Sequence, residues 1–211
     1  MKKGISLSIL MLLLFVTTQS FAQINFGVRA GLNLSSAKVE LPSSVTKKML
    51  ASFHVGGMVA YNFSETFALE PGLILSGEGV KFEETYLGTK YTYSYSPLYL
   101  EIPVNAVYKI NLGSAKLDLF AGPFFGIGIG GKYKDEDGSV DIKFGTSDES
   151  DMKRGNFGLN FGAGIELNSI LIRAQYGLGL VNLDPQGSSS DEMKSRVIGI
   201  SVGYMFGEKS K

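Results

Sequence analysis

The sequence predicts an eight-stranded antiparallel up-and-down transmembrane β-barrel, and three observations support this fold class. Apolar residues alternate with small or polar residues over about eight segments of about 10 to 13 residues, the length that a tilted strand needs to cross a bilayer. The opposite face of these segments is rich in glycine, which weakens a water-facing strand but fits a crowded barrel interior. Short and long connections also alternate along the chain, as periplasmic turns and extracellular loops do in outer-membrane barrels.

The N-terminal segment has the pattern of a secretory signal peptide. Two lysines precede an apolar run from Ile5 to Val16, and small or polar residues follow up to Ala22. A run of about 12 apolar residues is shorter than the roughly 20 that a transmembrane helix needs. We therefore expect residues 1–22 to be a cleaved signal peptide and residues 23–211 to form one barrel domain.

Composition excludes several other classes of protein. The chain has 20 basic and 20 acidic side chains, and removing the two N-terminal lysines leaves 18 − 20 = −2, so no basic surface for nucleic acid is indicated. There is no cysteine, hence no disulfide framework, thiolate metal site or lipid-anchored cysteine. We expect a monomer in the bacterial outer membrane, in contact with outer-membrane lipid, without a nucleic-acid partner and without a cofactor.

Each of the first four strands is defined by apolar side chains at every second position. Residues 24–34 alternate them with asparagine, glycine and arginine, and residues 53–63 lead into a short turn. Residues 67–75 return from that turn. Residues 98–110 carry the stretch YLEIPVNA, whose apolar positions are expected to face lipid while its carboxylate faces the interior.

The last four strands continue this alternation in two further pairs. Residues 117–129 and 157–167 oppose their apolar positions to rows of glycine and asparagine, and residues 170–180 follow a short turn. Residues 198–206 end the barrel with aromatic residues at the level of the periplasmic girdle. The long connections, expected to be extracellular, are residues 35–52, 77–96, 131–155 and 184–195.

Three prolines lie inside the expected strands, namely Pro71, Pro103 and Pro123. Every strand of a closed barrel has two partners, so each proline must either remove a ladder hydrogen bond or sit at a bulge. We expect the wall formed by these three strands to be locally distorted.

Five charged residues of the inward face form the best candidate site. Arg29, Glu70, Asp118 and Arg173 lie at a similar expected depth, and Glu101 enters higher from a descending strand. Unpaired buried charges are costly, so we expect the two arginines to pair with these carboxylates, Arg29 or Arg173 being the partner of Glu101. Such a network closes a lumen that is only wide enough for side chains; a gate or a proton path is the functional alternative.

Five stretches of the sequence resemble the PorT-like outer-membrane β-barrel proteins of Bacteroidetes. They are FGVRAGLN (Phe26 to Asn33), YLEIPVNAVYK (Tyr99 to Lys109), FAGPFFG (Phe120 to Gly126), FGLNFGAGIEL (Phe157 to Leu167) and RAQYGLGLVNL (Arg173 to Leu183). The resemblance implies an eight-stranded outer-membrane barrel. One branch of that family assists protein secretion by the type IX system, which makes such a role one hypothesis for this chain.

Two further stretches partly resemble ligand-binding motifs, one for phosphate and one for calcium, but both fit strands and turns better. The glycine-rich stretch from Gly126 to Lys132 matches the Gly-x-x-x-x-Gly-Lys part of a phosphate-binding loop. However, Tyr133 stands where that motif requires serine or threonine, and no helix is expected to follow. The acidic stretch from Asp135 to Asp141 fails the calcium-binding helix-loop-helix pattern and fits a tight turn at Gly138, although adventitious cation binding there stays open.

Two aromatic or titratable features leave a functional alternative open. Tyr86, Tyr91, Tyr93 and Tyr95 indicate either outward strand extensions or a platform for a glycan or a protein. His54 is the only histidine, so a lipid hydrolase of the Ser-His-acid type would have to use it, but a lone histidine is more often structural.

Three hypotheses for the function follow. The first is a non-enzymatic barrel with a plugged polar lumen that acts in envelope integrity or surface interaction, with protein partners at its extracellular loops or periplasmic turns. The second is an accessory component of type IX secretion, and the third is a lipid-modifying enzyme. No catalytic, cofactor-binding or metal-ligating residue is assigned.

Overall fold

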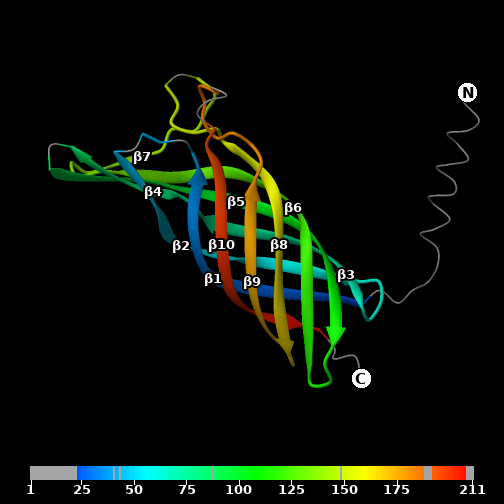
Figure 1. The fold of residues 1–211 in the computed structure, drawn as a ribbon. Helices are drawn as coiled ribbons and strands as arrows, with labels where there is room; N and C mark the ends of the chain where they lie inside the picture. Colours follow the sequence, from blue (N-terminus) through cyan, green and yellow to red (C-terminus); the bar gives the residue numbers. More distant parts are fainter. Residues whose placement is uncertain are drawn as a thin grey trace, which may run out of the picture.

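The computed structural model describes residues 23–39, 41–42, 44–86, 88–147, 149–187 and 192–207. The expected signal peptide, residues 1–22, lies outside these ranges and stays a prediction. Within them the chain is all β (Figure 1), and no helix there is long and apolar enough to cross a membrane. The strands are β1 (Gln23–Lys38), β2 (Val45–Asn62), β3 (Phe67–Gly77), β4 (Val80–Tyr86), β5 (Thr89–Asn111), β6 (Ala115–Lys134), β7 (Ser139–Asp141), β8 (Gly155–Leu167), β9 (Ile170–Gly179) and β10 (Lys194–Phe206).

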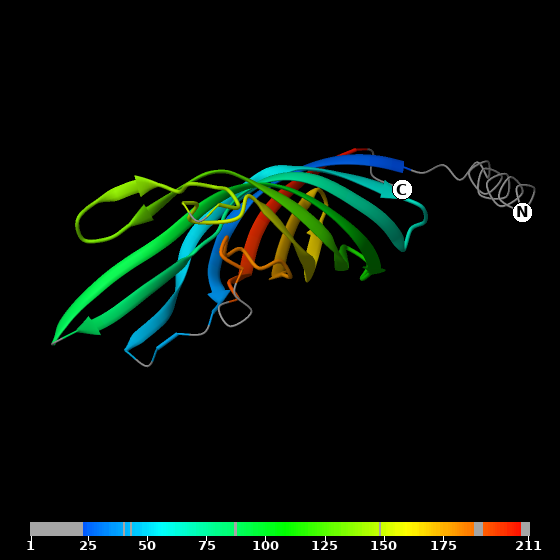
Figure 2. The ribbon, with the colours of Figure 1, turned by 90° about the horizontal axis from the view of Figure 1, so that it is seen from above.

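Eight of these described strands close into a barrel. Each is antiparallel to both neighbours, in the order β1, β2, β3, β5, β6, β8, β9 and β10, and β10 pairs again with β1. The strands in front and those behind cross at a steep angle in Figure 1, as tilted barrel strands do, and Figure 2 shows the wall curving round. The predicted eight-stranded antiparallel barrel is confirmed, and its closure leaves this ring without a free edge.

The barrel wall has one apolar and one polar face, as its alternating sequence predicts. Along β1 and β10, Leu32 is 70% exposed and Ile200 is 59% exposed, whereas the intervening Asn33 and Ser201 are buried. The exposed apolar side chains continue round the remaining wall strands. Such a belt is unfavourable in water and is the surface that a transmembrane barrel presents to lipid.

Extended pairing replaces parts of three of the expected long loops, residues 35–52, 77–96 and 131–155. β4 pairs with the first part of β2 and with the first part of β5, so these strands extend the wall beyond the membrane-spanning part (Figure 2). β7 pairs with the end of β6 across the turn at Gly138. The sequence predicted these residues mainly as loops because each short strand has too few alternating apolar positions; pairing satisfies their backbone groups and buries Phe82.

The three prolines coincide with gaps in the strand pairing. Paired residues are missing beside Pro71 between β2 and β3, beside Pro103 between β3 and β5, and beside Pro123 between β5 and β6. Each proline is paired on its other side, and the register is the same before and after each gap. The predicted distortion is therefore a missing backbone hydrogen bond in the strand ladder, because proline has no N–H to donate. The register shift in this part of the wall lies elsewhere, between Leu98 and Tyr99.

Candidate functional site

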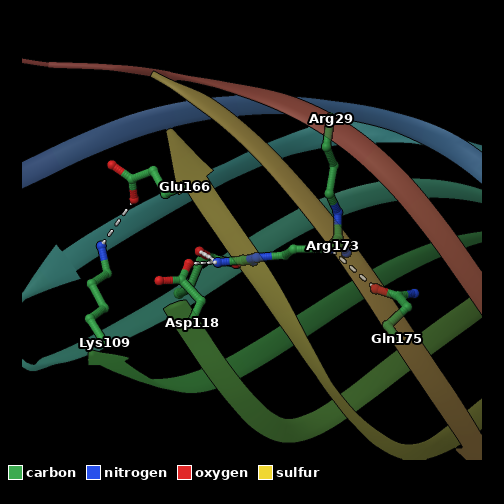
Figure 3. A network of polar contacts seen from close by, with 7 residues as sticks. Arg29, Lys109, Asp118, Glu166, Arg173 and Gln175 are labelled. Carbon is green, nitrogen blue, oxygen red and sulfur yellow. Dashed lines mark hydrogen bonds and ion pairs between the residues drawn. The ribbon is translucent and has the colours of Figure 1, made fainter. Parts of the chain in front are cut away.

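The lower part of the lumen is organised by Arg173 of β9. Its Nη1 and Nη2 donate to the two carboxylate oxygens of Glu70 on β3, the Nη2 contact being 2.9 Å, and Nη2 also donates to Asp118 Oδ2 on β6 at 3.0 Å (Figure 3). All three residues are at most 3% exposed, and the guanidinium lies 4.8 Å from the ring centroid of Phe120. This fork-shaped arrangement ties three sides of the barrel together.

Two further polar contacts flank that cluster. Arg29 of β1 donates from Nη1 to Gln175 Oε1 at 3.2 Å, so its hydrogen bond is to an amide instead of a carboxylate. Nearer the periplasmic end, Lys109 Nζ lies 3.9 Å from Glu166 Oε2 (Figure 3). Together these groups fill the periplasmic half of the lumen with paired polar side chains.

Of the two arginines expected as partners of Glu101, Arg29 interacts with it electrostatically but forms no ion pair within 4 Å, and Arg173 pairs with Glu70 and Asp118 instead. Glu101 of β5 pairs with Ile74 of β3, four residues further along β3 than Glu70. The two carboxylates therefore lie at different depths in the lumen. Glu101 is instead beside Ser76 and Glu78, with Arg29 as its electrostatic neighbour. The five expected residues therefore divide into a lower cluster and an upper one, and Glu78 is a member that the sequence analysis missed because it follows a strand end.

His54 is part of a neutral bridge in the upper lumen. Its Nδ1 lies 2.8 Å from Asn33 Oδ1, and Asn33 Nδ2 donates to Ser76 Oγ at 3.1 Å and to the Gly77 carbonyl at 2.9 Å. The histidine is 2% exposed, and among the described residues its hydrogen-bond partner is this amide and not a carboxylate. The contacts join β1, β2 and β3 and favour the structural interpretation of His54.

The extracellular mouth is covered by the connection between β7 and β8. Phe144 lies 6.2 Å from the Tyr99 ring, and a Cβ added at Gly128 would meet the Phe144 ring at 2.5 Å. Arg154 lies over the Phe144 ring at 5.6 Å and donates to the Gly128 carbonyl at 3.0 Å. Phe144 therefore occupies the space beside Gly128 that a larger side chain would fill. The sequence around Phe144 has no alternating pattern that would predict this position.

Two apolar clusters seal the same end. One consists of Ile142, Met152 and Leu183, with Phe144 packed against it, and brings together the connections that follow β7 and β9. The other contains Ala37, Val80 and Phe82, with Tyr93 and Tyr95 among its partly buried neighbours. Burial of these side chains fixes the loops as a lid on the lumen.

The tyrosines and the acidic turn both belong to strand extensions. Tyr91, Tyr93 and Tyr95 lie on β5, and Tyr95 packs 4.9 Å from the Tyr133 ring on β6. In the turn, Asp135 Oδ1 accepts the backbone N–H groups of Asp137 and Gly138, both at 3.0 Å. Within the described ranges no group of three or more His, Cys, Asp or Glu side chains is placed to hold a metal ion.

A small ion-pair cluster holds the outer extension together. Glu83 of β4 lies 2.7 Å from Lys48 Nζ on β2 and 2.8 Å from Lys90 Nζ on β5, and these hydrogen bonds lower the pKa of Glu83 to about 2. Because the pKa in the folded state is depressed, this stabilisation is present above the ordinary pKa of 4.5 and is lost as the pH falls toward 2.

We expect Lys48→Ala to raise the pKa of Glu83 toward its ordinary value, since the first of its two lysine contacts is removed. A carboxyl titration by NMR on the protein in micelles measures this shift. Lys132→Ala, which removes a pair with Asp141 elsewhere on the outer face, is the control and leaves the Glu83 titration unchanged. An identical Glu83 midpoint in Lys48→Ala and the unmodified protein would contradict the assignment.

The geometry defines a class, a transmembrane β-barrel with an apolar outer belt and a filled polar lumen. Residues 19–184 match the model of the outer membrane protein beta-barrel domain family, and the chain belongs to that family. It is therefore an integral protein of the bacterial outer membrane. No match was found among curated proteins.

Several solved outer-membrane proteins are similar to this chain at low identity. Ail of Yersinia pestis is 16% identical, with 87% of this chain and 99% of that chain covered and a TM-score of 0.43. Neisserial surface protein A is 11% identical, with 86% and 97% covered and a TM-score of 0.46. Outer membrane protein W of Escherichia coli is 13% identical, with 88% and 98% covered and a TM-score of 0.42.

Proposed function

We propose that the protein is a non-enzymatic outer-membrane barrel that presents its extracellular strand extension to a partner at the cell surface or maintains envelope integrity through it. The observation that carries this proposal is the contrast between the two ends of the fold. The lumen is filled by buried ion pairs and covered by Phe144, whereas the extension of β2, β4 and β5 stands clear of the membrane with a fixed shape. A filled lumen argues against transport, and a preformed outer surface favours recognition.

His54 offers little support for an enzyme. Its ring is buried and engaged by Asn33, so neither a nucleophile nor an acid is oriented by it in the described part of the chain. A general base needs a substrate proton within hydrogen-bonding reach, and a ring that is 2% exposed offers little surface to a substrate. We propose that the histidine stabilises the wall and takes no part in chemistry.

The extension can be tested separately from the barrel. Val80 pairs with Tyr95, so replacing residues 80–95 by a two-residue turn removes the outer hairpin and keeps the wall strands. The matched control is Val140→Thr, which changes an exposed side chain on the neighbouring β7 hairpin and leaves the extension intact. Heat-modifiable migration in gel electrophoresis checks that both variants fold.

We expect the shortened variant to lose a surface crosslink formed in intact cells and to give the same detergent sensitivity as a deletion strain, while the control behaves as the unmodified protein. The reason is that the contact surface is removed while the membrane-embedded part is kept. A deletion strain complemented fully by the shortened variant would refute the proposal.

Membership of the PorT-like branch, with a role in type IX secretion, is the second candidate. It is supported by the five matching stretches, of which YLEIPVNAVYK lies in the distorted wall of β5. The expected result is copurification with secretion components after mild solubilisation and reduced secretion on deletion. Normal secretion in the deletion strain would exclude this candidate and leave the surface role intact.

A further inference from the structure

The upper lumen holds two carboxylates, neither of which forms an ion pair within the described part of the chain. Glu78 is 4% exposed and Glu101 is 8% exposed, and their carboxyl groups are within hydrogen-bonding reach of each other. Among the described residues no ion pair within 4 Å joins either of them to a lysine or arginine. Two buried like charges at this separation are unfavourable unless a cation or a proton lies between them.

The charges of the buried carboxylates and arginines in the lumen do not balance. Arg173 pairs with Glu70 and Asp118, whereas Arg29 is bonded to Gln175 and interacts electrostatically with both Glu70 and Glu101. Four buried carboxylates, Glu70, Glu78, Glu101 and Asp118, therefore face two arginines, which leaves 2 − 4 = −2. The arginines at the mouth do not supply the difference: Arg154 donates to the Gly128 carbonyl, and Arg196 donates to the carbonyls of Gly179 and Ser195.

Neutral oxygen atoms converge on the same place. Glu101, Gly126 and Asn156 occupy one row across β5, β6 and β8. A Cβ added at Gly126 would lie 3.4 Å from Glu101, 3.5 Å from Tyr99 and 3.6 Å from Asn156, so the three side chains surround this glycine. Asn156 Nδ2 lies 3.4 Å from Glu78 Oε2 and 3.1 Å from Ser195 Oγ, which brings Glu78 into the group.

Two of these groups have a buried oxygen without a partner. The hydroxyl of Tyr99 and Oδ1 of Asn156 make no hydrogen bond, although both side chains are 0% exposed. The Tyr99 hydroxyl lies close enough to interact electrostatically with both glutamates. A cavity of about 10 Å³, large enough for about one water-sized sphere, adjoins Glu78 and Ser195 on the side that faces the lid residues Met152 and Leu183.

We propose that this cluster is a binding site for one divalent cation of the hard, oxygen-preferring class, Ca²⁺ in particular. Glu78 and Glu101 supply the two negative charges, and Tyr99, Asn156 and Ser195 supply neutral oxygens; a half-turn of the Asn156 amide presents its Oδ1 to the ion. Ca²⁺ accepts six to eight oxygen ligands in irregular geometry, which suits groups that come from different strands and a loop. The bound ion would cross-link the lid side of the wall.

The experiment uses the purified full-length protein in detergent micelles, stripped with EDTA. Ca²⁺ binding is measured by calorimetry, and Tb³⁺ is used as a luminescent probe because excitation of the adjacent Tyr99 would sensitise its emission. We expect one site, a rise in the thermal unfolding midpoint on adding Ca²⁺, and Tb³⁺ emission that Ca²⁺ displaces. Glu78→Gln and Glu101→Gln should each lower the affinity for Ca²⁺ at least about tenfold, because the number of charged ligands helps to set that affinity.

The control is the double variant Asp135→Asn, Asp137→Asn, which neutralises two carboxylates of the exposed acidic turn and should leave Ca²⁺ binding unchanged. Absence of Ca²⁺ binding to the unmodified protein, or unaltered binding in both glutamine variants, would overturn the proposal. A glutamine variant that is more stable than the unmodified protein without Ca²⁺, and whose stability does not change on adding Ca²⁺, would also overturn it. That result would indicate that Glu78 and Glu101 share a proton instead of an ion. If the glutamine variants do not refold, Tyr99→Phe decides, since unchanged Ca²⁺ affinity together with unchanged Tb³⁺ emission would refute the site.

Discussion

Arg173→Ala is expected to destabilise the barrel by about 3 to 5 kcal/mol, the range for removing one partner of a buried ion pair. The substitution leaves Glu70 and Asp118 facing each other in the lumen, where Arg173 now donates to both. The cost is thus mainly that of two buried carboxylates that lose their ion-pair partner. Urea unfolding of the protein in detergent micelles, followed by tyrosine fluorescence, measures the change.

Two comparisons make that result specific. Lys132→Ala breaks an ion pair with Asp141, but both side chains are more than half exposed, so we expect a change below about 1 kcal/mol. The triple variant Arg173→Met, Glu70→Gln, Asp118→Asn removes all three charges and should recover most of the loss. A loss in Arg173→Ala no larger than that of Lys132→Ala would contradict the buried network.

Ile200→Arg is expected to cost about 2 to 4 kcal/mol, the range for a cation on the lipid face near the middle of a transmembrane barrel. Ile200 is 59% exposed on β10 beside Leu32, and its neighbours along the outer face are apolar. An equally exposed side chain on a water-facing surface would tolerate arginine. Folding into lipid vesicles with urea titration measures the difference.

Val140→Arg is the matched control, because Val140 is 61% exposed but lies on β7 outside the barrel wall. We expect it to change the free energy of unfolding by less than about 0.5 kcal/mol, as ordinary surface substitutions do. Equal effects at the two positions would show that the belt around Ile200 does not face lipid.

The wall could be predicted from the sequence because its signal is periodic. Alternation along β1 assigns Leu32 to lipid and Asn33 to the lumen without reference to any other strand, and the same applies to each wall strand. The extension was harder: β4 has Val80 and Phe82 as its buried apolar positions, too few to distinguish a strand from a loop.

The lumen contacts could be predicted only in part, since they depend on depth as well as face. Sequence assigns Glu101 to the interior and higher than Glu70, but strand stagger decides that it meets Glu78. Glu78 and Phe144 lie outside the alternating segments, so their positions depend on the path of a loop, which no local pattern specifies. Family membership supports the barrel and does not add to these contacts.

We propose that the lumen is closed by the Arg173 cluster at one end and by Phe144 and the apolar clusters around it at the other. Single-channel recording in planar lipid bilayers tests it most directly. The structure predicts no steady conductance for the unmodified protein across the range of applied voltage. A stable, reproducible open channel in the same preparation would contradict the closed lumen.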